Sequence, residues 1–160
     1  EVVDRGEGVV NNHLNAAVAS DGTLYITSKM NRYVAGQPML VLHIRAPIGS
    51  WQRVPFANYT GAITPTRPIV LLDADEEQLW FVHTALDNSQ WNMHAIMSRS
   101  MNRKVSSMPS PPATVIAPHL DLQNATSCKS RLPRNPPWIV LASDRWGNIY
   151  EGLIKPAPQP

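Results

Sequence analysis

An Asp-Gly pair between two runs of strand-forming residues limits the possible folds of this chain more than any other sequence feature. Residues 13–20 form a short apolar run, Asp21 and Gly22 interrupt it, and residues 23–27 resume with β-branched and aromatic side chains. An Asp-Gly pair in this setting is the strongest short-range signal for a β-hairpin, because both turn positions require positive φ. The sequence therefore predicts a hairpin over residues 13–27.

The same plan returns twice along the chain. A second pair of apolar runs spans residues 67–84 around an acidic turn, and a third spans residues 138–152 around a turn that holds Trp146 and Gly147. The hairpins recur at spacings of about 55 and 70 residues, which suits four-stranded β-propeller blades with long loops. A repeat of this kind predicts two more strands after each hairpin.

Further strand candidates follow the first two hairpins. They are residues 39–45, 51–56, 91–99 and 114–117. The third hairpin is followed only by a proline-rich tail at residues 155–160. We therefore expect an all-β chain that forms about two and a half four-stranded antiparallel blades of a β-propeller. The expected blades cover residues 1–154, with repeats at about 13–60, 67–120 and 137–154.

Composition agrees with short strands and turns. Charged residues make up only 16% of the chain and there are 15 prolines, against about 25% charged and about 5% proline in typical domains. Every stretch of ten or more residues that could show helical periodicity is interrupted by a Pro or Gly, so we expect helix in under about 10% of residues. We also expect residues 102–112 and the tail to be the least ordered segments, because they offer little apolar burial.

Charge and cysteine content exclude several classes of protein. The net charge is +2 and the longest basic run is Arg103-Lys104, which disfavours binding to nucleic acid or acidic membranes. No apolar window is long enough for a membrane span. Cys128 is the only cysteine, so an internal disulfide or a multi-cysteine zinc site is excluded. The chain begins at Glu1 and lacks an initiator methionine, which is typical of a processed product or an excerpt.

Several phrases of the sequence resemble sialidase-like propellers, also called bacterial neuraminidase repeat propellers, and especially bacterial secreted members of that group. The phrases are residues 12–15, 19–25, 66–70 and 124–129. The resemblance implies a secreted or cell-surface module that binds a carbohydrate or another protein without catalysis. The alternative is part of a sialidase-like glycoside hydrolase whose other catalytic residues lie outside this chain. Closed propellers have about 4 to 8 blades, so missing sequence of the same precursor or neighbouring subunits would complete the ring.

The resemblance also points to a polar site on the innermost strands. Sialidases hold an anionic sugar with an arginine cluster, a Tyr-Glu pair and an Asp, since planar guanidinium groups match a carboxylate. Arg67 opens one expected inner strand, and Trp146 lies in a turn where it could stack on a sugar. The candidate ligand-binding residues are His13, Asn15, Lys29, Arg67, Lys129 and Trp146. The competing interpretation is that they solvate the channel, and we assign no catalytic residue and no cofactor.

Other polar residues favour structural roles. The acidic turn, with Asp73, Asp75, Glu76 and Glu77, could bind calcium through its oxygens, but a solvated turn is favoured because the loop lacks the glycine spacing of calcium loops. The five histidines lack metal-site spacing, so we expect packed strand residues and no metal. Arg45 and Arg99 end equivalent strands and are expected to be solvated. Among the tryptophans only Trp146 is expected to be exposed.

Overall fold

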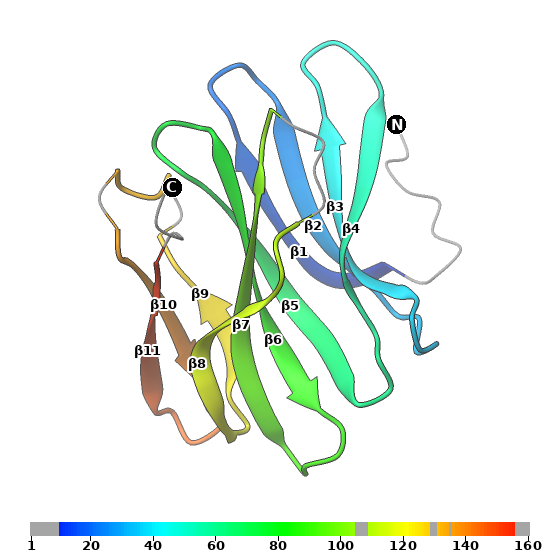
Figure 1. The fold of residues 1–160 in the computed structure, drawn as a ribbon, viewed down its shortest axis with the longest axis vertical. Helices are drawn as coiled ribbons and strands as arrows, with labels where there is room; N and C mark the ends of the chain where they lie inside the picture. Colours follow the sequence, from blue (N-terminus) through cyan, green and yellow to red (C-terminus); the bar gives the residue numbers. More distant parts are fainter. Residues whose placement is uncertain (1–9, 105–108, 129–130, 135, 156–160) are drawn as a thin grey trace.

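The chain folds into antiparallel sheets that follow one another along the sequence (Figure 1). The computed structural model describes residues 10–104, 109–128, 131–134 and 136–155, and this part of the chain contains eleven strands and no helix. The expected all-β class is therefore confirmed for the described residues. The expectation of low order covers residues 102–112 and 155–160, and of these residues 105–108 and 156–160 lie outside the described part of the chain.

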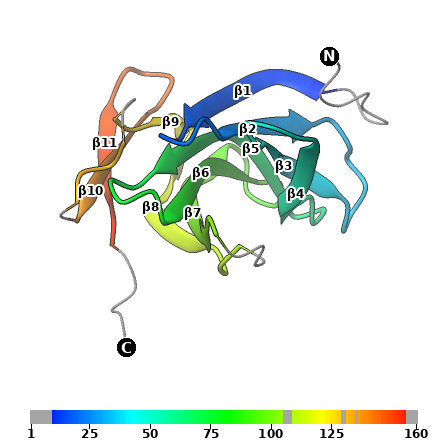
Figure 2. The same cartoon turned by 90° about the horizontal axis from the view of Figure 1, so that it is seen from above.

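Strands pair with their sequence neighbours in three sheets. The first sheet holds β1 (Val10–Val18), β2 (Leu24–Met30), β3 (Pro38–Arg45) and β4 (Trp51–Asn58). The second sheet holds β5 (Ile63–Leu72), β6 (Gln78–Asp87), β7 (Met93–Asn102) and β8 (Ala113–Leu120). The third sheet holds β9 (Gln123–Thr126), β10 (Trp138–Ser143) and β11 (Ile149–Ile154), with β10 in its centre. Figure 2 shows the three sheets from above.

The three expected hairpins are confirmed as β1–β2, β5–β6 and β10–β11. In the first, Gly22 has a φ of 83° and its N–H donates to the carbonyl of Ala19 at 3.0 Å, as a tight turn requires. The four additional strand candidates are also confirmed, as β3, β4, β7 and β8. β9 is a strand of four residues that was not expected. It pairs with β10, so that β10 is the central strand and β11 an edge strand of the third sheet.

The second sheet packs against the other two and is covered on both faces. Phe81 on β6 stacks on Phe56 of the first sheet with ring centroids 4.6 Å apart. The next residue, Trp80, meets Trp138 of the third sheet edge to face at 5.4 Å. Because successive side chains of a strand point to opposite faces, β6 is buried along most of its length. Two apolar cores, one on each side of the second sheet, thus hold the three sheets together.

The outer face of the third sheet exposes several apolar side chains beside Glu151. Ile139, Leu141, Ile149 and Leu153 lie there, and Ile149 is 73% exposed. Within the described residues the sheets do not close into a barrel or ring. The same residues include no helix that is long and apolar enough to cross a membrane.

Candidate functional site

The first strands of the three sheets, β1, β5 and β9, frame the candidate site. Asn15 of β1 bridges to β5, because its side-chain oxygen accepts a hydrogen bond from the N–H of Val70 at 2.9 Å. Thr27 of β2 adds a second link by donating to the carbonyl of Pro68 at 3.4 Å. These contacts hold the middle of β1 against β5, where a cavity of about 310 Å³ opens. The expectation that Arg67 opens its strand is wrong, because β5 begins at Ile63.

Three of the predicted ligand-binding residues line this cavity. His13 and Asn15 come from β1 and Arg67 comes from β5. The cavity is completed by Asn124 and Thr126 of β9, which the sequence analysis did not select. The sequence feature that could have pointed to these two residues is a short polar stretch, which is a weak signal for a strand. Asn124 has a φ of 57°, which only a few residue types adopt readily.

Arg67 owes its position to a break in the β5–β6 ladder. The pairing register shifts between Thr66 and Ile69, so Arg67 lies in a β-bulge, and its φ is 50°. A left-handed backbone at a non-glycine residue costs on the order of 1–3 kcal/mol and persists only where its surroundings enforce it. Bulges of this kind redirect a side chain, and here the redirected side chain lines the cavity.

The charges around the cavity are positive and lack carboxylate partners. Burial lowers the pKa of the Arg67 guanidinium from its ordinary value. Burial, with the positive charges of Arg67 and Lys29, also lowers the pKa of His13, which is therefore neutral at pH 7. Lys29 donates to the hydroxyl of Tyr33 at 3.5 Å. Among the described residues neither Arg67 nor Lys29 forms an ion pair, which leaves an uncompensated positive field at the cavity.

The remaining predicted site residues lie elsewhere. Lys29 is buried on β2, near His13 but not among the residues that line the cavity. Lys129 falls outside the described residues. Trp146 lies in the β10–β11 turn, where the guanidinium of Arg145 lies 4.4 Å from its ring centre. It is not among the residues that line the cavity. The expectation that Trp146 is the only exposed tryptophan is wrong, since Trp91 is 76% exposed and Trp146 54%.

A larger cavity of about 600 Å³ continues along the same inner strands. It shares Asn15, Ile69 and Thr126 with the first cavity and extends past Val18 and Leu72 toward Arg131. No Asp, Glu or Tyr is among the described residues that line either cavity. The lining can therefore supply amides, hydroxyls and guanidinium groups to a ligand but no carboxyl pair for acid–base chemistry.

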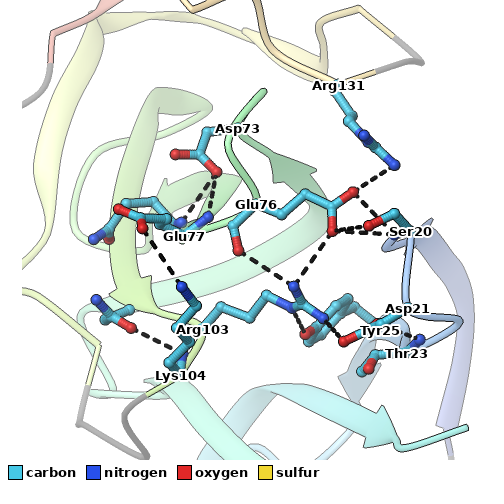
Figure 3. A network of polar contacts seen from close by, with 12 residues as sticks. Ser20, Asp21, Thr23, Tyr25, Asp73, Glu76, Glu77, Arg103, Lys104 and Arg131 are labelled. Atoms are coloured by element: carbon cyan, nitrogen blue, oxygen red, sulfur yellow. Dashed lines mark hydrogen bonds and ion pairs between the residues drawn. The ribbon is translucent and has the colours of Figure 1, made fainter.

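A buried carboxylate joins the three sheets at one end (Figure 3). Glu76, in the β5–β6 turn, accepts hydrogen bonds from the N–H and hydroxyl of Ser20 at 2.9 Å and 2.8 Å. It also pairs with Arg103 at 3.3 Å and with Arg131. Ser20 belongs to the first sheet's hairpin, Arg103 follows β7 and Arg131 precedes β10, so this carboxylate touches segments of all three sheets.

Arg103 extends this network to the first hairpin. Its Nε donates to the hydroxyl of Tyr25 at 2.6 Å, and a terminal nitrogen pairs with Asp21 (Figure 3). Burial raises the pKa of Glu76, but the hydrogen bonds from Ser20 and the charges of Arg131 and Arg103 outweigh it, so this pKa lies below its usual value.

The expectation of a solvated acidic turn is wrong for Glu76, which is only 7% exposed because its carboxylate is bound on three sides. Asp75 and Glu77 are exposed as expected, and they pair with Arg134 at 2.9 Å and Lys104 at 3.5 Å. Asp73 caps the turn by accepting from the N–H of Glu77 at 2.8 Å. In the described part of the chain no three His, Cys, Asp or Glu side chains are grouped as metal ligands.

The histidines behave largely as packed strand residues. His43 bonds the hydroxyl of Ser28 at 2.9 Å, and His94 contacts the carbonyl of Leu122 at 3.0 Å. His119 is exposed and stacks on Tyr150 at 4.5 Å. The expectation of a solvated Arg99 is wrong, because its Nε is buried and burial lowers its pKa.

Comparison with known proteins finds no matching family model and no matching curated protein.

Proposed function

We propose that this chain is a portion of a β-propeller that acts as a non-catalytic binding module, and that the cavity between β1, β5 and β9 binds an acidic carbohydrate. The observation that carries the proposal is Arg67, a half-buried guanidinium that lines the cavity and has no ion pair among the described residues. A partly buried cation without an ion-pair partner keeps only part of its hydration, and a ligand carboxylate would supply the opposite charge.

The other lining residues suit a sugar. Asn15 and Asn124 carry side-chain amides, and Thr126 carries a hydroxyl. These groups can donate to and accept from sugar hydroxyls, while a guanidinium recognises a carboxylate through two parallel hydrogen bonds. The ring of His13 is neutral and its Nδ1 is buried without a partner among the described residues, so it offers a further polar contact.

The binding interpretation is preferred to the hydrolase alternative because of what lines the cavities. Glycoside hydrolysis needs two carboxyls about 5 to 5.5 Å apart for retention, or about 6.5 to 9.5 Å apart for inversion, or a Tyr-Glu pair in place of the nucleophile. The described lining offers none of these groups. Catalysis would thus require residues from outside this lining.

The exposed apolar faces favour further blades as partners. Ile139 on β10 and Ile149 on β11 are 51% and 73% exposed on one face, and Leu14 and Val18 on β1 are each 59% exposed. Exposed apolar side chains gathered on one face favour an interaction site. We propose that blades of the same precursor or of neighbouring subunits cover these faces and that the assembled protein acts at the cell surface or outside the cell.

Calorimetric titration with N-acetylneuraminate and glucuronate tests the proposed function. The methyl esters of both sugars, which keep every hydroxyl but lack the negative charge, serve as matched ligands. We expect the acids to bind and the esters to bind at least about tenfold more weakly, because a charged hydrogen bond is worth about 1.5–3 kcal/mol. Arg67→Met removes this preference, whereas Lys155→Met, at an exposed residue beyond β11, leaves it unchanged.

Two results would contradict the proposal. Equal affinity for acids and esters would show that the positive field does not select the ligand. Release of free N-acetylneuraminate from sialyllactose by the purified protein would show catalysis and favour the hydrolase alternative.

A further inference from the structure

A separate cavity of about 370 Å³ lies between the first and second sheets, away from the inner-strand site. Its floor is a row of small side chains in register across three strands, with Pro65 opposite Ala85 and Ala85 opposite Ala95. Facing sheets pack about 10 Å apart, so small residues in a row leave a trough where larger ones would fill the space. Ala57 and Thr60, at the end of β4 and just beyond it, form part of the opposite wall.

A neutral histidine lies in the wall of this cavity. His83 is 4% exposed, and its pKa is lowered by burial to about 4, so the ring carries no charge at pH 7. Its Nδ1 lies 3.2 Å from the carbonyl of Thr84, which can only accept, so Nδ1 holds the proton. Nε2 therefore carries a lone pair, and it is buried without a partner among the described residues.

An arginine supplies the opposite chemistry. Arg99 on β7 lines the same cavity, and its Nε is buried and unbonded within the described residues. In the described part of the chain one of its terminal nitrogens is engaged, donating to the carbonyl of Ser110 at 3.3 Å. Buried polar groups are almost always hydrogen-bonded, so a cavity with one orphaned donor and one orphaned acceptor is complementary to a ligand that carries both partners.

We propose that this cavity is a binding site for a small aromatic hydroxycarboxylate. The ligand carboxylate accepts hydrogen bonds from Arg99, its hydroxyl donates to Nε2 of His83, and its ring lies over the row of small side chains. Met93 and Met97 border that row, and thioether sulfurs make favourable contacts with aromatic rings. The volume falls within the about 300–1,000 Å³ of typical small-molecule sites. This site is independent of the proposed carbohydrate site.

Asp87, which also lines the cavity, restricts the ligand to a single negative charge. It accepts from the N–H and hydroxyl of Ser89 at 2.9 Å and 2.6 Å, and these hydrogen bonds lower its pKa, so it is ionised at pH 7. β6 places Asp87 four residues beyond His83, at the end away from Arg99. A second carboxylate on the ligand would meet this negative charge and be rejected.

Titration of the full chain with meta-hydroxyphenylacetate, followed by calorimetry and by the nitrogen NMR signals of the histidine rings, tests the site. Phenylacetate lacks the hydroxyl and meta-hydroxyphenylethanol lacks the carboxylate, so these compounds separate the two contacts. We expect meta-hydroxyphenylacetate to bind saturably and at least about tenfold more tightly than either comparator, and to shift the Nε2 signal of His83.

Substitutions of Arg99 test its contact with the ligand carboxylate. Arg99→Met is expected to weaken binding at least about tenfold, while Arg99→Lys retains part of it because the charge remains. Arg45→Met, at the end of β3 and outside this lining, is the control and leaves binding unchanged. Absence of saturable binding, equal binding of the three compounds by the unaltered protein, or full binding by Arg99→Met would each overturn the proposal, and the three-compound comparison needs no variant to fold.

Discussion

Asn15 and Val70 connect the inner strands of the first two sheets through one hydrogen bond of 2.9 Å, from the Val70 N–H to the Asn15 side-chain oxygen. Asn15→Ala leaves this backbone N–H without its partner, and we expect unfolding free energy to fall by about 1–2 kcal/mol in urea titration. Asn58→Ala, at an exposed position, is the control and should change it by less than about 0.5 kcal/mol. Equal effects of the two substitutions would show that the bridge contributes nothing.

The network around Glu76 predicts a sharp difference between two adjacent cations. Arg103 contacts Glu76, Tyr25 and Asp21, whereas the side chain of Lys104 is 68% exposed and reaches only Glu77. Arg103→Met leaves these partners unsatisfied and should lower the melting temperature by about 5 °C. Lys104→Met should leave it nearly unchanged, since exposed ion pairs contribute little. A larger loss for Lys104→Met would refute the assignment of the network as a link between sheets.

Gly152 marks a close approach between the second and third sheets. A β-carbon at this position of β11 would lie 2.5 Å from a side-chain carbon of Ile116 and 2.6 Å from the carbonyl oxygen of Val115, both on β8. Gly152→Ala therefore forces the strands apart, and we expect a loss of about 1–3 kcal/mol in unfolding free energy. Glu151→Ala, one residue earlier and exposed, controls for the strand itself. An unchanged unfolding free energy in Gly152→Ala would contradict this packing.

His83 makes stability depend on pH in a defined window. Its pKa in the folded protein is about 4, below the ordinary 6.5, so the unfolded chain takes up the proton first. Above pH 6.5 the ring is mostly neutral in both the folded and the unfolded chain. As the pH drops from 6.5 toward 4, the unfolding free energy falls by about 3 kcal/mol in total, and about 2 kcal/mol of this is lost by pH 5.

Urea titrations at pH 7 and pH 5 measure this difference. His83→Gln removes the titrating group and should reduce the difference between the two pH values by about 2 kcal/mol, whereas His119→Gln, at an exposed residue, should not. A pH dependence that persists unchanged in His83→Gln would mean that other groups cause it. The lowered pKa of Glu76 adds a loss of stability only at lower pH, as that carboxylate becomes protonated.

Local patterns were sufficient to predict the hairpins and the all-β class. The Asp21-Gly22 turn and the alternation around it depend on neighbours in the sequence, and the structure agrees with both. β9 was missed because a polar strand of four residues has no periodicity to detect. Its place is set instead by packing on the second sheet, where Ala125 joins the core around Trp80.

The candidate site was predictable in part for the same reason. His13, Asn15 and Arg67 were selected by repeat position, and the equivalent strands β1 and β5 do lie side by side, although all three residues lie within these strands and not at their ends. The role of Glu76 could not be predicted, since Arg103 and Arg131 approach it from segments distant in sequence. The bulge at Arg67 is likewise a property of its pairing with β6 and leaves only the Arg-Pro dipeptide as a local sign.

Binding of an acidic ligand to Arg67 in the inner-strand cavity can be tested by a crystal structure of the protein soaked with N-acetylneuraminate. We expect a sugar between β1, β5 and β9 with its carboxylate within hydrogen-bond distance of the Arg67 guanidinium. A sugar bound only at another surface, or an empty inner-strand cavity at a ligand concentration that saturates the protein in solution, would contradict it.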